Sequence, residues 1–161
     1  MKENTMRKLT YRNLTEQDKQ QICRWKYEGK YAVYDLPDYD LMKAKQAGFA
    51  DPEKEKDYYA FFDGEILTGY VNIREKNGEV SVGIGVEPHL CGQHYGRDIL
   101  EYACGISREL HPGKMLSLEV RTWNTRAIRC YEHTGFMIDG EPHILMTGSG
   151  PDLFYRMIRE E

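Results

Sequence analysis

Cysteine is scarce in this chain and is not arranged for metal binding or cross-linking. The four cysteines (Cys23, Cys91, Cys104 and Cys130) are scattered and form no CxxC pair. This spacing argues against a zinc site and a disulfide framework and favours a reducing compartment, so we expect a cytoplasmic protein. No HExxH sequence occurs, and the five histidines show no ligand spacing, so no metal is expected.

Long apolar runs and an excess of positive charge are also missing. The first residues, MKENTMRKLTYRNL, contain no apolar stretch of signal-peptide length, and no segment approaches the length of a membrane span. A net charge of -4 argues against nucleic acid and anionic membranes as partners. With 161 residues and no linker, repeat or low-complexity tract, the chain is expected to be soluble and to form a single domain over residues 1–161.

The first half of the chain predicts a strand, two helices and a three-stranded meander. RKLTYRNL alternates as a strand, and TEQD begins a helix in which Thr15 caps and Asp18 lies at the capping-box spacing. A second helix is predicted over Leu41–Gln46, ending at Gly48. The segments DYYAFFD, EILTGYVNIRE and EVSVGIGVEP, joined by Asp-Gly and Asn-Gly turns, predict antiparallel strands.

The second half predicts helices between further strands. Apolar residues from Ile99 to Leu110 recur at helical spacing, MLSLEV predicts a buried strand, and a helix from Asn124 to His133 closes at Gly135. FMIDGEPHILMTGSGPDLFYRMIRE predicts a last pair of strands, and only the connection from VGIGVEP to MLSLEV has the length of a parallel crossover. The expected fold class is therefore α+β: a central mixed, mostly antiparallel sheet of about seven strands with about four helices.

The stretch VGIGVEPHLCGQHYGRDIL runs from a strand through a short loop into a helix. The N–H groups at the start of a helix have no intrahelical partner, so such a loop can hold an anion, and a pyrophosphate suits it. Gly92 and Gly96 would let the backbone approach closely, and His94 tolerates left-handed backbone angles. An ordinary strand-to-helix turn explains the loop alone equally well.

A second pattern, N-x-x-A-x-x-x-Y-x-x-x-G-F, is spelled by Asn124, Ala127, Tyr131, Gly135 and Phe136. Asparagine is a favoured N-cap, and an aromatic residue two helical turns later is more often core than catalyst. Each residue alone therefore has a structural explanation. The joint occurrence of this pattern with the strand-loop-helix stretch is much more specific.

With both motifs in this order of elements, almost the whole chain resembles the GNAT family of acetyl-CoA-dependent N-acetyltransferases. Cys91 stands where the family loop often has arginine or glutamine, and His94 stands where it usually has glycine. The resemblance implies that acetyl-CoA is the cosubstrate and that its pantetheine arm enters between two diverging strands, a close approach that Gly83 and Gly85 would permit. The implied acetyl-CoA contacts are Ile84, Val86, Cys91, Gly92, Gln93, His94, Tyr95, Gly96, Arg97, Asn124, Ala127 and Tyr131.

The resemblance also implies direct attack by a neutral amine on the acetyl thioester. A main-chain N–H near Val86 would polarise the carbonyl, and Tyr131 would donate a proton to the leaving sulfur. For the base, Glu79 and Glu87, with His89 nearby, or a water chain remain open. Both glutamates also fit a solvated surface charge.

The family grips its acceptor largely with the first helices and neighbouring loops. Trp25, Tyr27, Tyr31 and Tyr34, interleaved with acidic residues, would suit a cationic amine of a small molecule or peptide. A tyrosine-rich packing layer explains them equally well. A catalytically weak or inactive acyl-CoA-binding or interaction module on the same fold is the alternative function, and a homodimer is left open.

Overall fold

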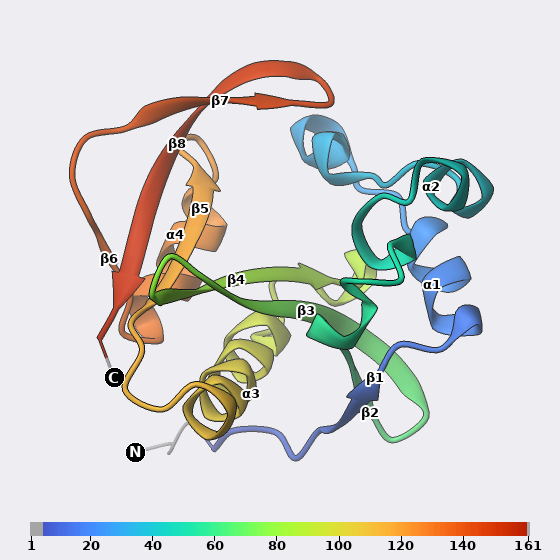
Figure 1. Ribbon diagram of the computed structural model, residues 1–161, viewed down its shortest axis with the longest axis horizontal. Helices are drawn as coiled ribbons and strands as arrows, with labels where there is room; N and C mark the ends of the chain where they lie inside the picture. Colours follow the sequence, from blue (N-terminus) through green and yellow to red (C-terminus); the bar gives the residue numbers. More distant parts are fainter. Residues whose placement is uncertain (1–4, 161) are drawn as a thin grey trace. The chain divides into compact units, whose positions relative to one another are not determined.

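The computed structural model describes residues 5–160, which form eight strands, four α-helices and four short 3-10 helices (Figure 1). The strands are β1 (Thr10–Asn13), β2 (Tyr58–Asp63), β3 (Ile66–Lys76), β4 (Glu79–Val86), β5 (Leu116–Arg121), β6 (Met137–Ile138), β7 (His143–Thr147) and β8 (Gly150–Arg159). The helices are α1 (Glu16–Cys23), η1 (Gly29–Tyr34), α2 (Tyr39–Lys45), η2 (Gly48–Ala50), η3 (Glu55–Asp57), η4 (Pro88–Leu90), α3 (Tyr95–Leu110) and α4 (Thr125–His133).

All eight strands belong to one sheet. Hydrogen-bonded neighbours follow the order β1-β2-β3-β4-β5-β8-β6, and β7 also pairs with β8. β4 and β5 run parallel and are connected through α3, whereas β1 with β2 and β5, β6 and β7 with β8 are antiparallel. The expected α+β fold with a mixed, mostly antiparallel sheet is confirmed.

The expected count of about seven strands is one short, because the region after α4 forms three strands instead of two. β6 and β7 both pair with β8, β6 near its carboxyl end and β7 near its start. The break between them contains Gly140, which has φ +78°, and Pro142, which has no N–H for a sheet ladder. The sequence at Gly140 and Pro142 therefore explains why β6 and β7 are separate strands.

The described chain folds as two compact units. One contains the residues up to Val71 together with Gly85–Ile99, and the other contains Asn72–Ile84 together with the residues from Leu100 onward. The expected single domain over residues 1–161 concerns both units together and stays a prediction.

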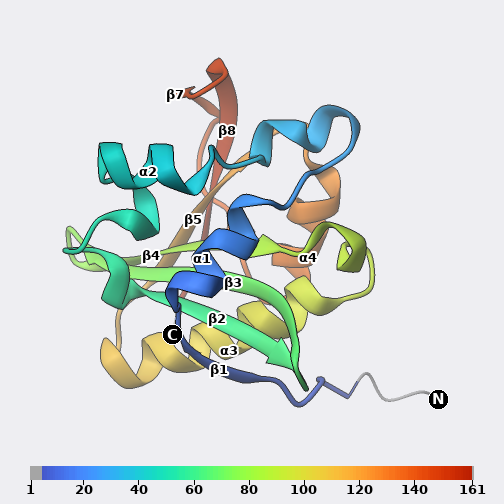
Figure 2. The ribbon, with the colours of Figure 1, turned by 90° about the vertical axis from the view of Figure 1, so that its right-hand side faces the viewer.

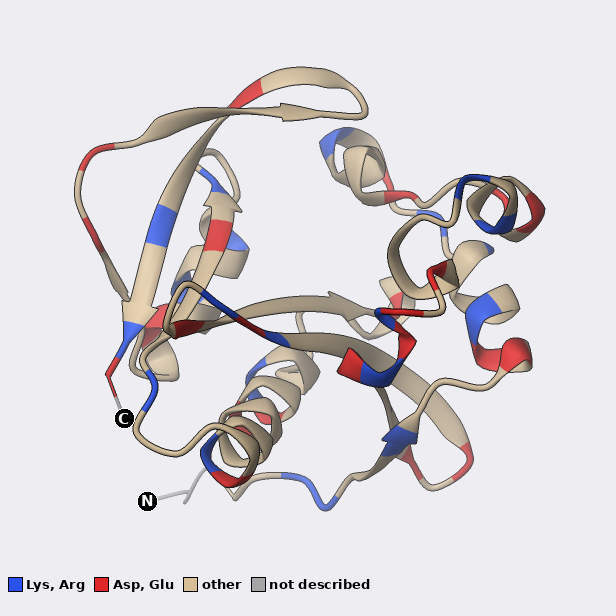
Figure 3. Cartoon of the chain, in the orientation of Figure 1, with Lys and Arg blue, Asp and Glu red and all other residues tan. Residues whose placement is uncertain are grey.

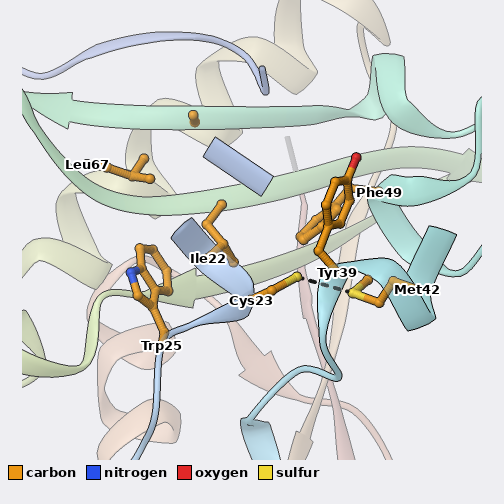
Figure 4. Packing of buried hydrophobic residues seen from close by; sticks show 8 residues of the cluster. Ile22, Cys23, Trp25, Tyr39, Met42, Phe49 and Leu67 are labelled. Carbon is orange, nitrogen blue, oxygen red and sulfur yellow. Dashed lines mark hydrogen bonds between the residues drawn. The ribbon is translucent and has the colours of Figure 1, made fainter. Parts of the chain in front are cut away.

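In the first unit, α1 and α2 bury their apolar sides against β2 and β3 (Figures 2 and 4). Thr15 caps α1 as predicted: its hydroxyl accepts from Asp18 N at 3.2 Å, and the Asp18 carboxylate accepts from Thr15 N at 2.9 Å. The core cluster consists of Ile22, Cys23, Trp25, Tyr39, Met42, Phe49, Ala60 and Leu67. Burial raises the pKa of the Cys23 thiol to about 11, so this cysteine packs as a small apolar residue.

Helix α2 begins two residues before the predicted segment Leu41–Gln46. Its C-cap is Gln46, in the left-handed region at φ +48°, which closes the helix before Gly48.

In the second unit, the two faces of β5 and β8 differ in character. Leu118 and Met157 are paired across the strands and buried, and Arg159 on the same face donates to the carbonyl of Thr134 at 2.7 Å, just after α4. The opposite face carries the registered pair Glu119 and Arg156, and Figure 3 shows acidic and basic positions on these two strands. One face thus buries apolar side chains, and the other carries the charged pair Glu119 and Arg156 between pairs that contain Ile158 and Phe154.

Across residues 5–160, none of the helices has the length and apolarity that crossing a membrane requires.

Candidate active site

Strands β4 and β5 pair over a short stretch only. Their parallel register covers Val80 with Leu116 and Ser81 with Ser117, although β4 continues to Val86 and β5 continues to Arg121. Beyond Ser117, β5 keeps β8 as its neighbour on the other side. The part of the β4 edge that ends at Val86 therefore lies outside the register with β5.

The main chain of Val86 faces this part of the edge. Glu87 N donates to the carbonyl of Thr68 on β3 at 2.8 Å, so the main-chain groups of Glu87 point toward β3. The main-chain N–H and carbonyl of Val86 point away from β3, because these groups alternate in direction from one residue to the next along a strand. The carbonyl of Val86 accepts a hydrogen bond from the Tyr27 hydroxyl at 2.7 Å.

The loop between η4 and α3 has the backbone geometry of an anion-binding turn. Gly92 and His94 have φ of +82° and +68°, so the left-handed conformation predicted as tolerable for His94 is adopted. A Cβ built on Gly92 meets nothing within 4 Å, so this face of the loop is open to an incoming group. Asp98 N donates to the carbonyl of His94, and the N–H groups ahead of it at the start of α3, a 16-residue helix, have no intrahelical partner. These features fit a pyrophosphate.

Several side chains of the loop turn back onto the protein. The Cys91 sulfur lies 3.9 Å from the Val86 carbonyl oxygen and 3.7 Å from that of Glu87, and the Gln93 side-chain amide donates to the carbonyl of His89 at 3.0 Å. The main chain of these residues, more than their side chains, is therefore available to an anion. Arg97, in the first turn of α3, is partly exposed.

Tyr95 anchors the start of α3. Its hydroxyl donates to Asp63 at 2.6 Å, and the guanidinium of Arg7 lies 3.9 Å from its ring centroid. Arg7 also donates to Asp98 at 3.1 Å, and this carboxylate is 4 % exposed. The Tyr95 side chain thus fixes the helix start, and its contribution to binding an anion would come from its main chain.

The two glycines of β4 meet neighbours within the protein. A Cβ on Gly85 would lie 2.5 Å from the Tyr70 ring, and one on Gly83 would lie 3.4 Å from the side chain of Asn72. We expected a ligand to approach Gly85 closely. On the side that a Cβ would occupy, the Tyr70 ring makes this close approach instead. The main chains of Ile84 and Val86, like those of Val80 and Val82, point away from β3, and both residues lie beyond the stretch in register with β5.

Asn124 is the N-cap of α4. Its side-chain oxygen accepts from Ala127 N at 3.2 Å, and the residue is buried. Tyr131 is half-buried on the same helix, with its ring 6.4 Å from that of Phe136. The capping explanation of Asn124 is thus observed, and its contact with acetyl-CoA stays a prediction.

The two glutamates weighed as bases differ in their contacts. Glu79 holds both terminal nitrogens of Arg156 at 2.6 and 2.7 Å, and these hydrogen bonds lower its pKa despite some burial. A carboxylate stabilised in this way is a weaker base. Glu87 caps η4 by accepting from His89 N at 2.9 Å, and it pairs with the His89 ring at 2.8 Å; this pairing raises the pKa of His89.

Glu119 on β5 is an acidic residue that reasoning from the sequence missed. It lies two residues beyond Ser117, on the same face as Arg156, and its carboxylate is 3.0 Å from His143 Nε2 on β7. Burial raises its pKa, against the opposing effects of His143 and Arg156. The signal available in the sequence was its position as the only charged residue within MLSLEV, but the end of the β4 pairing and the distant His143 could not be read there.

The aromatic residues predicted to bind the acceptor divide into two groups. Trp25 is buried in the core cluster, 6.1 Å from the Tyr70 ring. Tyr27, Tyr31 and Tyr34 are partly buried around η1, with the rings of Tyr27 and Tyr34 6.5 Å apart, edge to face. The packing explanation fits Trp25, whereas the three tyrosines lie nearer the surface.

Among residues 5–160, histidine, cysteine, aspartate and glutamate form no group of three or more suited to a metal ion.

A mixed sheet with one short parallel register, between β4 and β5, and a strand-loop-helix turn after β4 are features expected of acetyl-CoA-dependent acetyltransferases. The profile of the acetyltransferase (GNAT) family matches residues 19–136, and the chain therefore belongs to this family. A comparison with curated protein sequences gives no match.

Solved acetyltransferase structures share the fold over nearly the full chain. Spermidine N-acetyltransferase from Vibrio cholerae, in complex with CoA and spermine, superposes with a TM-score of 0.75 at 20% identity, over 94% of this chain and 95% of that one. The ribosomal-protein-S18-alanine N-acetyltransferase from Escherichia coli gives 0.66 at 20%, over 95% and 94%. AAC(6')-Ib in complex with ribostamycin and coenzyme A gives 0.72 at 16%, over 95% and 93%. At these identities the likeness establishes the fold.

Proposed function

We propose that this protein is an N-acetyltransferase that transfers the acetyl group of acetyl-CoA to a primary amine by direct attack. The observation that carries the proposal is the short register between β4 and β5, which ends at Ser81 and Ser117. It leaves main-chain groups at the end of β4 outside the register with β5, and a thioester-bearing ligand can use them as a strand would. Family membership and the turn around Gly92 support the same function.

Within this proposal, the acetyl-CoA pyrophosphate binds the main chain of the loop from Cys91 to Arg97. Partial positive charge at the start of α3 and the left-handed turn favour an anion there. The pantetheine pairs with main-chain groups near Ile84, and the N–H of Val86 polarises the thioester carbonyl. By the family resemblance, Asn124 and Ala127 at the start of α4 are further proposed acetyl-CoA contacts.

Two side chains would move protons. Tyr131 donates to the leaving sulfur, as the family resemblance implies. For the base we propose Glu119 in preference to Glu79. Glu119 is half-exposed, lies beyond the paired part of β4 and β5, and has a raised pKa, whereas Arg156 lowers the pKa of Glu79. Glu87, paired with His89, remains the second candidate.

The acceptor is proposed to be a cationic amine of a small molecule or peptide. The partly buried tyrosines around η1, interleaved with Glu28 and Asp35, offer ring faces and carboxylates to an ammonium group. Spermine and ribostamycin, bound in two structures of the same fold, belong to this chemical class.

Calorimetry with acetyl-CoA, followed by thiol release with an amine panel, tests the proposal. We expect binding and amine-dependent release of CoA, and Tyr131→Phe should slow transfer at least tenfold while leaving acetyl-CoA affinity nearly unchanged. Binding without transfer to any amine would favour an acyl-CoA-binding module on this fold. Absence of binding at millimolar acetyl-CoA would exclude both functions, and an unaltered rate in Tyr131→Phe would remove Tyr131 as the acid.

A further inference from the structure

The hydroxyl of Tyr27 contacts the carbonyl of Val86, the last residue of β4. It donates to Val86 O at 2.7 Å, from a residue 59 positions earlier in the chain. This carbonyl points away from β3, to the edge that the register with β5 does not reach. Tyr27 therefore supplies a hydrogen bond where a sheet would otherwise have a neighbouring strand.

The bond fixes the peptide that ends β4 from both sides. The carbonyl half of the Val86–Glu87 peptide accepts from Tyr27, and the N–H half donates to Thr68 on β3 at 2.8 Å. With both halves bonded, this peptide plane cannot rotate freely. The orientation of the adjoining N–H of Val86 is restrained with it.

Tyr27 is itself held in place as a donor. Its main-chain N–H donates to Asp35 at 2.8 Å, and its ring lies edge to face with Tyr34. Burial raises the pKa of its hydroxyl well above the ordinary tyrosine value, so Tyr27 keeps its proton at any working pH of the protein.

We propose that Tyr27 is a positioning residue for acyl transfer, acting through the main chain of Val86 and not through contact with the acceptor amine. By occupying the carbonyl of Val86, it leaves the N–H as the group that this residue offers at the edge. It also holds that N–H aimed at the thioester carbonyl. The inference rests on the proposed acetyltransferase function, and it separates Tyr27 from Tyr31 and Tyr34, which keep the proposed role in acceptor binding.

Tyr27→Phe tests this role, because it removes only the hydroxyl oxygen. We expect kcat to fall roughly five- to tenfold, the effect of one hydrogen bond, with the KM for the amine and the affinity for CoA unchanged. Tyr59→Phe is the matched control: Tyr59 is also a partly buried tyrosine of the first unit, on β2, and its ring lies against Tyr11. The control should keep the wild-type kcat.

The infrared stretch of ¹³C-labelled acetyl-CoA gives a readout that a purely structural role would not move. The thioester carbonyl should shift to lower frequency on binding to the wild type and return toward the free value in Tyr27→Phe. Measuring well below the thermal transition of both proteins keeps this comparison valid where the variant is less stable.

Three results would overturn the inference. They are an unchanged kcat, a raised amine KM at full kcat, and an unchanged carbonyl frequency in Tyr27→Phe. Failure of the proposed function has a different signature, because the wild type would then bind no acetyl-CoA in calorimetry; that result removes both proposals together.

Discussion

Glu79 and Glu119 stand on neighbouring strands and face the same arginine, yet their pKa values move in opposite directions. Glu79 receives both terminal nitrogens of Arg156, and its pKa is lowered. Glu119, registered opposite Arg156, has no such bidentate bond; burial raises its pKa, and His143 only partly offsets this. The contrast teaches that a bidentate ion pair can outweigh burial in setting the direction of a carboxylate's pKa shift.

Glu119→Gln should have the largest effect, because it removes the proposed base. We expect kcat to fall by about a hundredfold or more, the usual loss for a general base, at unchanged acetyl-CoA affinity. Steady-state kinetics with a saturating amine measures the loss. Glu79→Gln is the matched control and should keep kcat within about twofold. A larger loss of kcat in Glu79→Gln than in Glu119→Gln would make Glu79 the base.

Arg156→Met should affect stability more than chemistry. It leaves the Glu79 carboxylate, which is 25 % exposed, without its bidentate partner, so the free energy of unfolding should fall by about 1–3 kcal/mol at pH 7. Urea unfolding measures this. The double variant with Glu79→Gln should recover part of the loss, and full additivity of the two changes would contradict a direct interaction.

His143→Gln should increase the difference in pKa between Glu119 and Glu79. The groups that act on Glu119 are His143 on β7, Arg156 on β8 and Glu79 on β4. Because His143 lowers the pKa of Glu119, its removal should raise that pKa and move the acid limb of the kcat/KM profile to higher pH. The rate should drop several-fold on the acid side and stay unchanged on the alkaline plateau. An acid limb that stays in place would remove His143 from the site.

The smallest effect is the pH dependence of the stabilisation by Glu79. Its folded-state pKa lies below the ordinary value of 4.5, so the stabilisation is complete above pH 4.5 and is lost as pH falls through the folded-state pKa. The stability gap between wild type and Arg156→Met should therefore narrow on acidification. Urea unfolding from pH 7 to pH 3 tests this, and a gap that widens would contradict the pairing.

Local signals in the sequence predicted most of the fold. The capping box of Thr15 and Asp18, the N-cap at Asn124 and the left-handed angle at His94 each depend on a few neighbouring residues, and the structure has all three. The extra strand also had a local cause, the break at Gly140 and Pro142.

The candidate site was less predictable, because its chemistry depends on residues far apart in the chain. Burial raises the pKa of Glu119 while His143, 24 residues later, opposes that shift, and Arg156 reaches Glu79 across 77 residues. The family resemblance suggested Tyr27 as an acceptor residue, with packing as the alternative, but the hydrogen bond from its hydroxyl to the Val86 carbonyl joins residues 59 positions apart. No local pattern encodes such pairings.

Gly69 carries a consequence for anyone wishing to redesign this protein. A methyl group there would lie 2.6 Å from both the carbonyl oxygen of Gly85 and the side-chain tip of Ile99, five residues into α3. A single alanine on β3 would therefore push against the end of β4 and the first turns of α3 at once. Under the proposed function, libraries aimed at new acyl donors should therefore hold position 69 constant and vary its surroundings, because β4 and α3 flank the proposed pyrophosphate loop.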